Sequence, residues 1–485
     1  MSLGQKTLGG FIWTFISIVG TKLSTLIVGI VLARLLEPEA FGLVAMLYVF
    51  LEVSQVFVNS GFAHALIREK ELTEEDKCTT FFSNLGASLL FYTLLFFSAP
   101  AIADFYGQPE LVPLTRVMGL VLFAQAFTIV HSATLSNQLE FKKLSIAVTF
   151  SNIGAGIIAI IMAYRGFGVW AIGYKYLFTA VIKSVIFWVL NPWLPRKFID
   201  KASFKKLFGF GSKLLLTDLL ARLFNNVYKI IIGKAFSAAT LGFYTQGQQY
   251  IQHLSQGAGT TLKKVTFPVL SKTNEEPSVL NEAYKKIVLA SSFIIFPAIL
   301  SMIVLAEPLL VTLVGEKWLP SAPFLQILGF GTLVQHLYVL NQNILKVQGR
   351  SDQFLKLEAL AKVFTIVAIV IGIQFGIWGL LAAKVISDLI TFVLSQFFVK
   401  SYLEFRGGLQ IVQLLGIIGL CIPTIGLLVL ITFFTEWNEP IKLLVGVVLA
   451  AVSYLAVTYF LKSPSLAYIL ELLEKRFPVV SKLVF

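Results

Sequence analysis

Polar side chains recur at helical spacing in four otherwise apolar segments of the sequence. Positions four, three and four residues apart share one face of an α-helix, because successive residues turn by about 100°. A helix that is apolar elsewhere must turn such a face away from lipid, so we expect these faces to line an aqueous cavity. The alternative is that they join helices by hydrogen bonds. The four stripes are Tyr48, Glu52, Gln55 and Asn59; Asp218, Arg222, Asn225 and Lys229; Thr245, Gln249, Gln252 and Gln256; and Lys384, Asp388, Thr391 and Ser395.

Basic side chains inside apolar segments are the groups best suited to bind an anion, and each would cost about 2.5–3.5 kcal/mol at the centre of a lipid-facing helix. Asp218 with Arg222, and Lys384 with Asp388, are i,i+4 pairs for which we favour mutual neutralisation. Other lysines have no acid at neighbouring helical positions in their own segments. We predict that these lysines, together with Arg222, hold an external anion such as a diphosphate, unless they extend to the membrane surface. They are Lys22, Lys175, Lys183, Lys213 and Lys229.

Acids are scarce deep inside the apolar segments, and three of them are candidates for coupling to an ion gradient. Glu52 is the best candidate for a lone proton or cation carrier, and Asp218 and Asp388 are the others, with H+ or Na+ as the coupled ion. The four histidines share no segment or ligand spacing, and the two cysteines lie far apart. We therefore predict no metal site, no disulfide and no other cofactor. The sequence also lacks a Gly-x-x-x-x-Gly-Lys-Ser/Thr nucleotide loop and a His-Glu-x-x-His motif.

The composition indicates that the helices with these stripes belong to a membrane protein. Of the 485 residues, 57% are hydrophobic and 13% are charged, against about 25% charged in soluble domains. Since a span needs about 20 apolar residues, the length allows about fourteen spans. We predict an all-α polytopic membrane protein with helices near residues 8–35, 40–66, 78–104, 110–136, 144–164, 167–190, 207–234, 238–262, 287–315, 319–345, 357–373, 376–399, 409–434 and 440–461.

The distribution of basic residues predicts the orientation. With the N-terminus inside, 25 of the 39 Lys and Arg residues fall on the cytoplasmic side and five on the other. By the positive-inside rule, both termini are expected in the cytoplasm. Most of the net charge of +13 is thereby assigned to topology, so nucleic acid is not expected as a partner.

The sequence contains an internal repeat. A shift of 200 residues aligns Lys22 with Arg222, Arg34 with Lys234, and Gly42 with Gly242. The segment Phe167–Ala171 recurs as Phe375–Gly379, closing a second six-helix unit. Because six is even, both units enter the membrane in the same sense, as a parallel repeat. We expect an N-terminal lobe at 1–200, a C-terminal lobe at 201–400, two further spans at 401–462, and a cytoplasmic amphipathic tail at 463–485.

Several short motifs, occurring in order along the chain, resemble one family of transporters. The stretch Leu32–Met46 is similar to the first-to-second-span segment of the polysaccharide transporter family, the Wzx-type oligosaccharide flippases of the multidrug/oligosaccharidyl-lipid/polysaccharide exporter superfamily. Further matching strings lie at Phe105–Leu111, Gly166–Trp170, Ile232–Lys234, Leu241–Tyr244, Phe267–Pro268 and Gly315–Pro320. The resemblance implies two six-helix lobes, with two further helices in many members.

The same resemblance implies a function and a membrane. It suggests a flippase, not an enzyme, that moves undecaprenyl-diphosphate-linked oligosaccharide across the bacterial cytoplasmic membrane by alternating access, for O-antigen, capsule or exopolysaccharide. The expected partners are the lipid-linked oligosaccharide, membrane lipids and other polysaccharide assembly proteins. The alternatives are a cation-coupled drug antiporter of the same superfamily and a flippase for a lipid-linked peptidoglycan precursor. A ligase or polymerase of lipid-linked sugars is disfavoured, because the external segments are too short for a catalytic domain.

Overall fold

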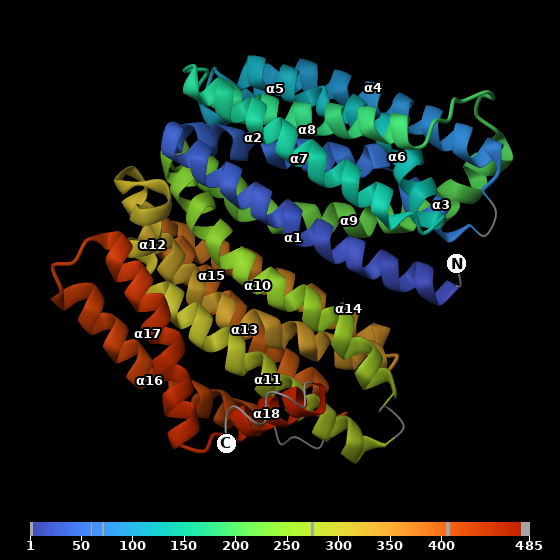
Figure 1. Cartoon of the computed structure of the whole chain (residues 1–485). Coiled ribbons are helices and arrows are strands. Elements are labelled where there is room, and N and C mark those ends of the chain that lie inside the picture. Colours follow the sequence, from blue (N-terminus) through green and yellow to red (C-terminus); the bar gives the residue numbers. More distant parts are fainter. Residues whose placement is uncertain (1–2, 60, 70–71, 273–275, 404–407, 477–485) are drawn as a thin grey trace. The chain divides into compact units, whose positions relative to one another are not determined.

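The computed structural model describes residues 3–59, 61–69, 72–272, 276–403 and 408–476, and over these residues the secondary structure is helical throughout (Figure 1). The elements are α1 (Leu3–Leu35), α2 (Pro38–Asn59), α3 (Phe62–Arg68), α4 (Glu74–Tyr106), α5 (Leu111–Gly119), α6 (Val121–Asn137), α7 (Phe141–Tyr164), α8 (Val169–Leu190), α9 (Lys201–Ala235), α10 (Ala238–Lys272), α11 (Pro277–Val304), α12 (Ala306–Val314), η1 (Glu316–Ser321), α13 (Ala322–Val347), α14 (Ser351–Gly372), η2 (Ile373–Phe375), α15 (Gly376–Val399), α16 (Gly408–Phe434), α17 (Glu439–Phe460) and α18 (Pro464–Arg476).

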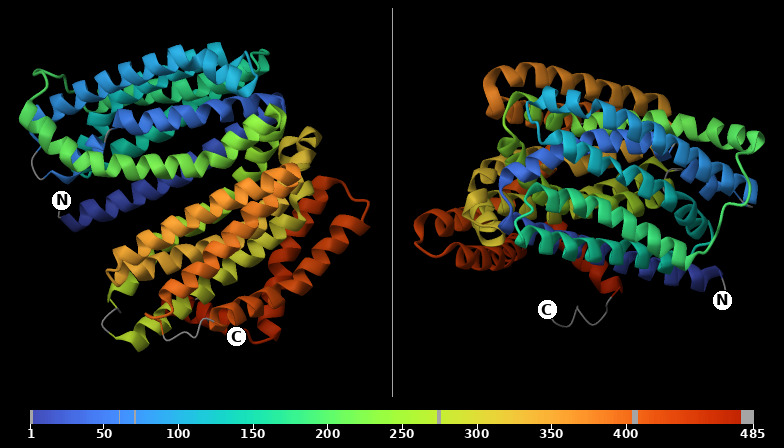
Figure 2. Two further views of the ribbon diagram at one scale, coloured as in Figure 1. Left: turned by 180° about the vertical axis from the view of Figure 1, so that it is seen from behind. Right: turned by 90° about the horizontal axis from the view of Figure 1, so that it is seen from above.

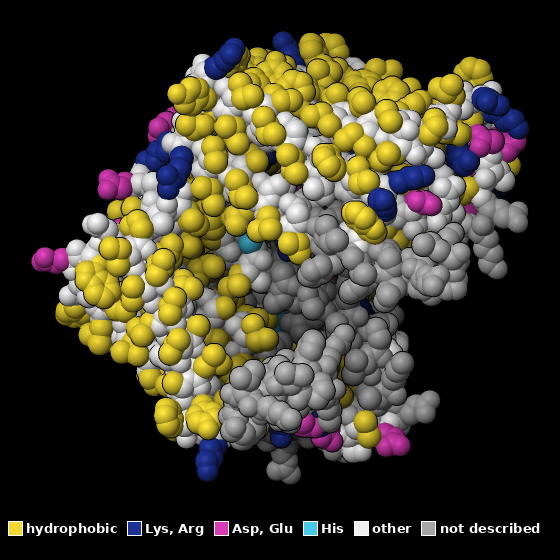
Figure 3. All heavy atoms as spheres, viewed as in Figure 1, with side chains coloured by type: hydrophobic (Ala, Val, Ile, Leu, Met, Phe, Trp, Pro, Cys, Tyr) yellow, Lys and Arg dark blue, Asp and Glu magenta, His cyan; other side chains and the backbone are white. Residues whose placement is uncertain are grey.

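The helices confirm the predicted all-α, polytopic membrane fold. Within the described residues, ten segments are long and apolar enough to cross a membrane, and one of them, Ser351–Val399, contains both α14 and α15. On the face seen in Figure 3, hydrophobic side chains dominate, and charged side chains lie mainly near its edges. Such a surface suits contact with lipid rather than water.

The chain divides into two units, residues 1–245 and 246–485. In the first unit, long helices run side by side: α7 packs against α1 and α8, and α2 packs against α4 and α9 (Figure 2). In the second unit, α15 packs against α13 and α14, and α11 contacts α13, α16 and α18. The contacts therefore group α9 with the helices before it. The lobe bounds expected from the repeat, with a boundary at residues 200 and 201, stay a prediction.

Several spans predicted as single helices are divided into two consecutive elements in the structure. The span predicted at 40–66 is split into α2 and α3, and Gly61 between them has φ 68°, a left-handed conformation that favours glycine. A Cβ on Gly61 would also lie 2.4 Å from the carbonyl oxygen of Gly211 in α9. The break thus brings α3 and α9 into close contact. The spans predicted at 110–136, 287–315 and 319–345 are likewise each made of two consecutive elements.

The segment between α8 and α9, residues 191–200, is fixed to the first turns of α4. The Trp193 indole N–H donates to Glu74 Oε2 at 2.7 Å, and the Asp200 amide donates to Thr79 Oγ1 at 2.9 Å. These bonds connect residues more than one hundred positions apart, so they position the start of α9 directly.

The first turn of α9 is held by capping and by an ion pair. Asp200 is its N-cap and accepts from the Ser203 amide at 2.7 Å, a bond that lowers the pKa of the Asp200 carboxyl. Lys206 lies 3.1 Å from Asp76 and 2.8 Å from Glu69. Because the Asp76 side chain is only 2% exposed, it depends on this ammonium for compensation of its charge.

The second helices of each half of the repeat, α2 and α10, cross with their backbones in contact. A Cβ on Gly42 in α2 would lie 1.8 Å from the carbonyl oxygen of Ala238 in α10, and a Cβ on Gly242 would lie 2.0 Å from that of Pro38. Each glycine thus meets the residue four positions before its counterpart, so the contact is reciprocal. Side chains cannot fit between backbones at this distance, and only glycine permits the crossing.

Replacing Gly42 with Ala should lower the melting temperature of the purified protein, because α2 and α10 must separate to admit the new Cβ. Overpacking of this kind costs about 1–3 kcal/mol. Intrinsic fluorescence during heating in detergent measures the change. Gly86→Ala in α4 is the matched control, since a Cβ there meets nothing within 4 Å. Equal melting temperatures for the two variants would contradict the close crossing.

Candidate functional site

Glu52 of α2 is bound by two side chains of α9. Arg222 Nη1 lies 3.1 Å from Glu52 Oε1, and Asn226 Nδ2 donates to Glu52 Oε2 at 2.6 Å. The Glu52 side chain is 14% exposed, whereas that of Arg222 is 51% exposed. The carboxylate is therefore neutralised within the first unit, while part of the guanidinium stays accessible. Glu52 is not the lone carboxylate that the sequence predicted, because its partners come from another helix.

Asn226 extends this network along α9. It is 2% exposed, donates to the backbone oxygen of Arg222 at 2.9 Å, and accepts from Lys229 Nζ at 3.0 Å. The sequence stripe named Asn225 instead, which is exposed. Spacings of three then four, and of four then three, both fit one helix face, so Arg222 and Lys229 allowed either asparagine. The signal for Asn226 was present but ambiguous.

The pairing predicted between Asp218 and Arg222 is not formed. Arg222 is directed to Glu52, and the described part of the chain records no ion pair for Asp218. Glu52, on a neighbouring helix, binds Arg222 through one carboxylate oxygen and Asn226 through the other. The described contacts show no such arrangement for Asp218, which lies on the same helix as Arg222. The prediction of mutual neutralisation was therefore wrong for this pair.

The predicted stripes of α2 and α9 meet at a small polar recess that α3 also lines. Its volume is about 100 Å³. Glu52 and Arg222 form part of the lining, and Asp218 lies beside them. The full lining is Glu52, Gln55, Val56, Asn59, Gly61, Ala63, His64, Leu215, Asp218 and Arg222. His64 also belongs to it, although the sequence analysis assigned the histidines no ligand role.

Two lysines of α8 lie near this network on one helix face. Lys175 and Lys183 are eight residues apart, with Thr179 midway, so the three side chains project in similar directions. Next to Lys175, the Tyr176 ring contacts the Tyr48 ring of α2, with centroids 5.0 Å apart. Tyr48 precedes Glu52 by one helical turn. The residue next to Lys175 therefore packs against the α2 stripe.

These lysines differ from Arg222 in their surroundings. Both are half-buried, and no hydrogen bond or ion pair to either ammonium occurs among the described residues. The Thr179 hydroxyl between them donates to the backbone oxygen of Lys175 at 2.7 Å, and no bond from either ammonium to this hydroxyl occurs among the described residues. Two cations inside a membrane segment thus lack a protein counter-charge in the part of the chain described here.

The remaining residues predicted for the site lie on α1, α9, α10 and α15. The Lys384–Asp388 pair of α15 is confirmed, with Nζ 3.0 Å from Oδ2. Gln249 lies 3.4 Å from His253 within α10, Gln252 is exposed, and Thr391 is half-buried. Lys22 is exposed on α1. The side chains of Lys213 and Gln256 lie outside the described residues. None of these contacts joins the network of α2 and α9.

One polar stripe position of the second unit serves helix packing. Ser395 of α15 is fully buried and accepts from Asn341 Nδ2 of α13 at 2.7 Å, and Asn341 in turn accepts from the Tyr284 hydroxyl of α11. This chain links three helices. It matches the alternative stated from the sequence, in which stripes join helices by hydrogen bonds.

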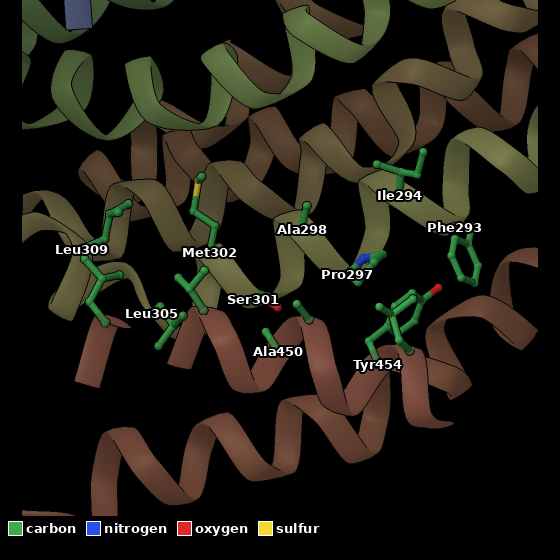
Figure 4. Close-up of a pocket in the computed structure, with 14 residues that line it drawn as sticks. Phe293, Ile294, Pro297, Ala298, Ser301, Met302, Leu305, Leu309, Ala450 and Tyr454 are labelled. Carbon is green, nitrogen blue, oxygen red and sulfur yellow. The ribbon is translucent and has the colours of Figure 1, made fainter. Parts of the chain in front are cut away.

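A cleft of the second unit is apolar. It has a volume of about 420 Å³ and lies between α11, the start of α12, and α17. Figure 4 shows Ile294, Pro297 and Met302 along one side, with Ala450 and Tyr454 on the other. Such a lining can hold hydrocarbon but offers no charge to a diphosphate or an ion. Within the described residues, no group of three His, Cys, Asp or Glu side chains is placed to hold a metal.

Comparison with known proteins finds that the chain is similar to proteins of polysaccharide biosynthesis. It is 25% identical over 353 residues to the teichuronic acid biosynthesis protein TuaB of Bacillus subtilis, covering 72% of this chain and 73% of that protein. It is 23% identical over 404 residues to the lipopolysaccharide biosynthesis protein WzxC of Escherichia coli, covering 82% and 81%. It is 22% identical to the succinoglycan biosynthesis transport protein ExoT of Rhizobium meliloti, covering 65% and 64%.

Solved structures show the same fold at low identity. The lipid II flippase MurJ in an inward closed conformation superimposes with a TM-score of 0.73 at 16% identity, covering 93% of this chain and 99% of that one. An inward-facing multidrug resistance MATE transporter of the MOP superfamily gives a TM-score of 0.61 at 17% identity, covering 79% and 95%. The chain thus has the fold of these MOP transporters. A family model described as "Polysaccharide biosynthesis protein" matches residues 31–323, and the chain belongs to that family.

Proposed function

We propose that this multi-pass membrane protein flips an oligosaccharide linked to a polyprenyl diphosphate, such as undecaprenyl diphosphate, across the cytoplasmic membrane. The observation that carries the proposal is the uncompensated pair Lys175 and Lys183 on one face of α8. Membership of a polysaccharide biosynthesis family supplies the substrate class. A lipid-linked glycan joins an apolar tail, a dianionic diphosphate and a hydrophilic sugar chain. The diphosphate would provide the charge that these lysines lack.

Arg222 and Lys229 have a second role in this proposal. Both are already engaged, Arg222 by Glu52 and Lys229 by Asn226. Because half of the Arg222 side chain is exposed, an arriving phosphate can share or replace Glu52 as its partner. Release of Glu52 would leave a carboxylate that can take up a proton, which is one route by which transport could couple to an ion gradient. Asp218 lines the same recess and offers a second such group.

The proposed mechanism is alternating access. Residues 1–200 and 201–400 move relative to each other, with both termini in the cytoplasm as the basic residues predict. Glu52 belongs to the first range and Arg222 to the second. The ion pair and the Asn226 hydrogen bond between α2 and α9 must then break during the cycle. Other polysaccharide assembly proteins would receive the glycan on the far side.

The cation-coupled drug antiporter is less well supported by these contacts. A site for a cationic drug needs an accessible carboxylate; Glu52 is held by Arg222 and Asn226, and the exposed Asp218 lines the same recess as the Arg222 guanidinium. Lys175 and Lys183, which have no ion-pair partner among the described residues, would repel such a drug. A lipid-linked peptidoglycan precursor shares the diphosphate and differs in the head group, so the lysines do not exclude it.

Deleting the gene should cause a diphosphate-linked oligosaccharide to accumulate in the lipid extract, because assembly continues while translocation stops. Mass spectrometry of the extract measures the product and identifies the glycan. Complementation with the wild-type gene is the control. Altered tolerance to dyes or drugs without any accumulated lipid-linked sugar would favour the antiporter instead.

Replacing Lys175 and Lys183 together with Gln should reduce glycan export at least about tenfold, since a charge-assisted bond to phosphate contributes about 1.5–3 kcal/mol. Export is measured as surface polysaccharide per unit of membrane-inserted protein, determined by immunoblotting. Lys143→Gln, at the start of α7, is the matched control. Normal export by the double variant at normal abundance would remove α8 from the substrate site.

Linking α2 to α9 covalently should stop transport. Cysteines at positions 52 and 222, in a background where Cys78 and Cys421 are replaced, are joined with a short bis-thiol reagent. A link between cysteines at positions 74 and 193 is the control, because Trp193 and Glu74 are bonded to each other and both lie within residues 1–200. If the 52–222 link leaves export as high as the 74–193 link does, the α2–α9 contact does not open during the cycle.

A further inference from the structure

Asn226 of α9 uses its amide on three different groups. Its Nδ2 donates to Glu52 Oε2 at 2.6 Å and to the backbone oxygen of Arg222 at 2.9 Å, and its Oδ1 accepts from Lys229 Nζ at 3.0 Å. Both N–H groups of the amide are therefore engaged, and the oxygen faces the ammonium because a cation needs an acceptor. Asn226 is buried, so these bonds are shielded from water.

The charged groups of this network are not all neutralised. Glu52 carries one negative charge, and Arg222 lies in direct contact with it at 3.1 Å. Lys229 instead meets the amide of Asn226, and no ion pair to its ammonium occurs among the described residues. An amide oxygen satisfies a hydrogen bond of an ammonium but brings no formal negative charge. The network therefore keeps one positive charge, and that charge resides on Lys229.

Glu52 is close enough to Lys229 to become its partner. Both side chains bond to the same amide, and their charges interact across it. The lysine stem is flexible, and its ammonium can bind from many directions. An ion pair is also stronger than a bond to an amide where water is excluded. Without the amide of Asn226, we expect Lys229 to turn to Glu52 Oε2, the oxygen that Asn226 occupies.

We infer that Asn226 is a positioning residue that separates Lys229 from Glu52 and thereby keeps the ammonium available to an anionic substrate. The inference rests on the proposed function, because it presupposes a diphosphate that reaches Lys229. An amide suits this role because it bonds to an acid and a cation at once without neutralising either. A carboxylate at this position would repel Glu52 and neutralise Lys229, and an apolar side chain would leave Glu52 Oε2 open to the ammonium.

This arrangement gives Lys229 and Arg222 different tasks. A phosphate that binds Lys229 displaces a hydrogen bond to a neutral amide, whereas one that binds Arg222 must share or displace the Glu52 carboxylate. The first exchange is easier because bonds between charged groups are stronger. When Lys229 leaves, Asn226 can keep both of its donor bonds. The substrate can thus bind Lys229 while the contact between α2 and α9 is intact, and that contact breaks later in the cycle.

The test measures binding of farnesyl diphosphate to full-length protein in nanodiscs by isothermal titration calorimetry. Lys229→Gln should weaken binding about fivefold or more in the wild-type background. Asn226→Leu should weaken binding to a similar extent, and adding Lys229→Gln to it should cause no further loss, because Glu52 already holds the ammonium. Adding Glu52→Gln to Asn226→Leu should restore the sensitivity to Lys229→Gln. This sensitivity is the deciding measurement, since Glu52→Gln also frees Arg222.

Asn152→Leu in α7 is the matched control. The Asn152 amide also donates to a backbone oxygen four residues earlier, that of Val148 at 2.8 Å, but no bond between it and a charged side chain occurs in the described part of the chain. It should leave the affinity and the effect of Lys229→Gln unchanged. Intrinsic fluorescence during heating shows whether each variant is folded, and Asn226→Ala takes the place of Asn226→Leu if the larger side chain prevents folding.

The outcomes separate this inference from the function on which it rests. An equal loss from Lys229→Gln in the wild-type and Asn226→Leu backgrounds would overturn the role of Asn226. So would a weakened Asn226→Leu protein that Glu52→Gln does not make sensitive to Lys229→Gln again, because a merely structural asparagine gives that result. If the probe binds through Lys175 and Lys183 but is indifferent to Lys229→Gln, this inference fails and the proposed diphosphate site stands. If the wild-type protein does not bind the probe, both proposals fail.

Discussion

A charge inside a membrane must be paired, hydrogen-bonded or kept in water, and this constraint orders the polar part of the molecule. It explains why Glu52 meets Arg222 and Asn226 on another helix, and why Asp388 meets Lys384 on its own. The same constraint makes Lys175 and Lys183 informative, because the described chain supplies no counter-charge for them. Charges that the fold neutralises can serve as movable contacts, and charges that it leaves uncompensated can serve as binding groups.

This distinction divides the polar groups of the first unit by role. The Glu52–Arg222 pair joins α2 to α9, and the half-exposed guanidinium makes it weaker than a fully buried pair would be. A weaker ion pair between α2 and α9 is easier to break, which suits a contact that the proposed transport cycle forms and breaks each time. The α8 lysines instead need a partner from outside. The recess beside Asp218 offers hydrogen bonds without a net positive charge. Anion binding and helix separation would then use different groups.

Local periodicity predicted much of this arrangement from sequence, and long-range pairing could not be predicted. The stripes of α2 and α9 line one recess, and the Lys384–Asp388 pair needs only an i,i+4 spacing. Glu52 and Arg222 are 170 residues apart, so no spacing rule connects them, and the nearer Asp218 was a misleading partner. All-α architecture follows from apolar length alone. The contacts that fix the start of α9 to α4 depend on a segment with no periodic pattern.

The two halves of the internal repeat share their helix positions but differ in their charged residues. Counterpart helices keep an offset of 200 residues: α1 and α9 end at Leu35 and Ala235, and α2 and α10 begin at Pro38 and Ala238. By the same offset, Arg222 corresponds to Lys22 and Glu52 to Gln252. The backbone crossing at Gly42 and Gly242 is thus kept in both halves, while the carboxylate is kept in only one. Both glycines are needed where the two backbones cross. In the function proposed above, the glutamine at position 252 leaves Lys22 without a repeat-related carboxylate, so its charge would stay available to an anionic substrate.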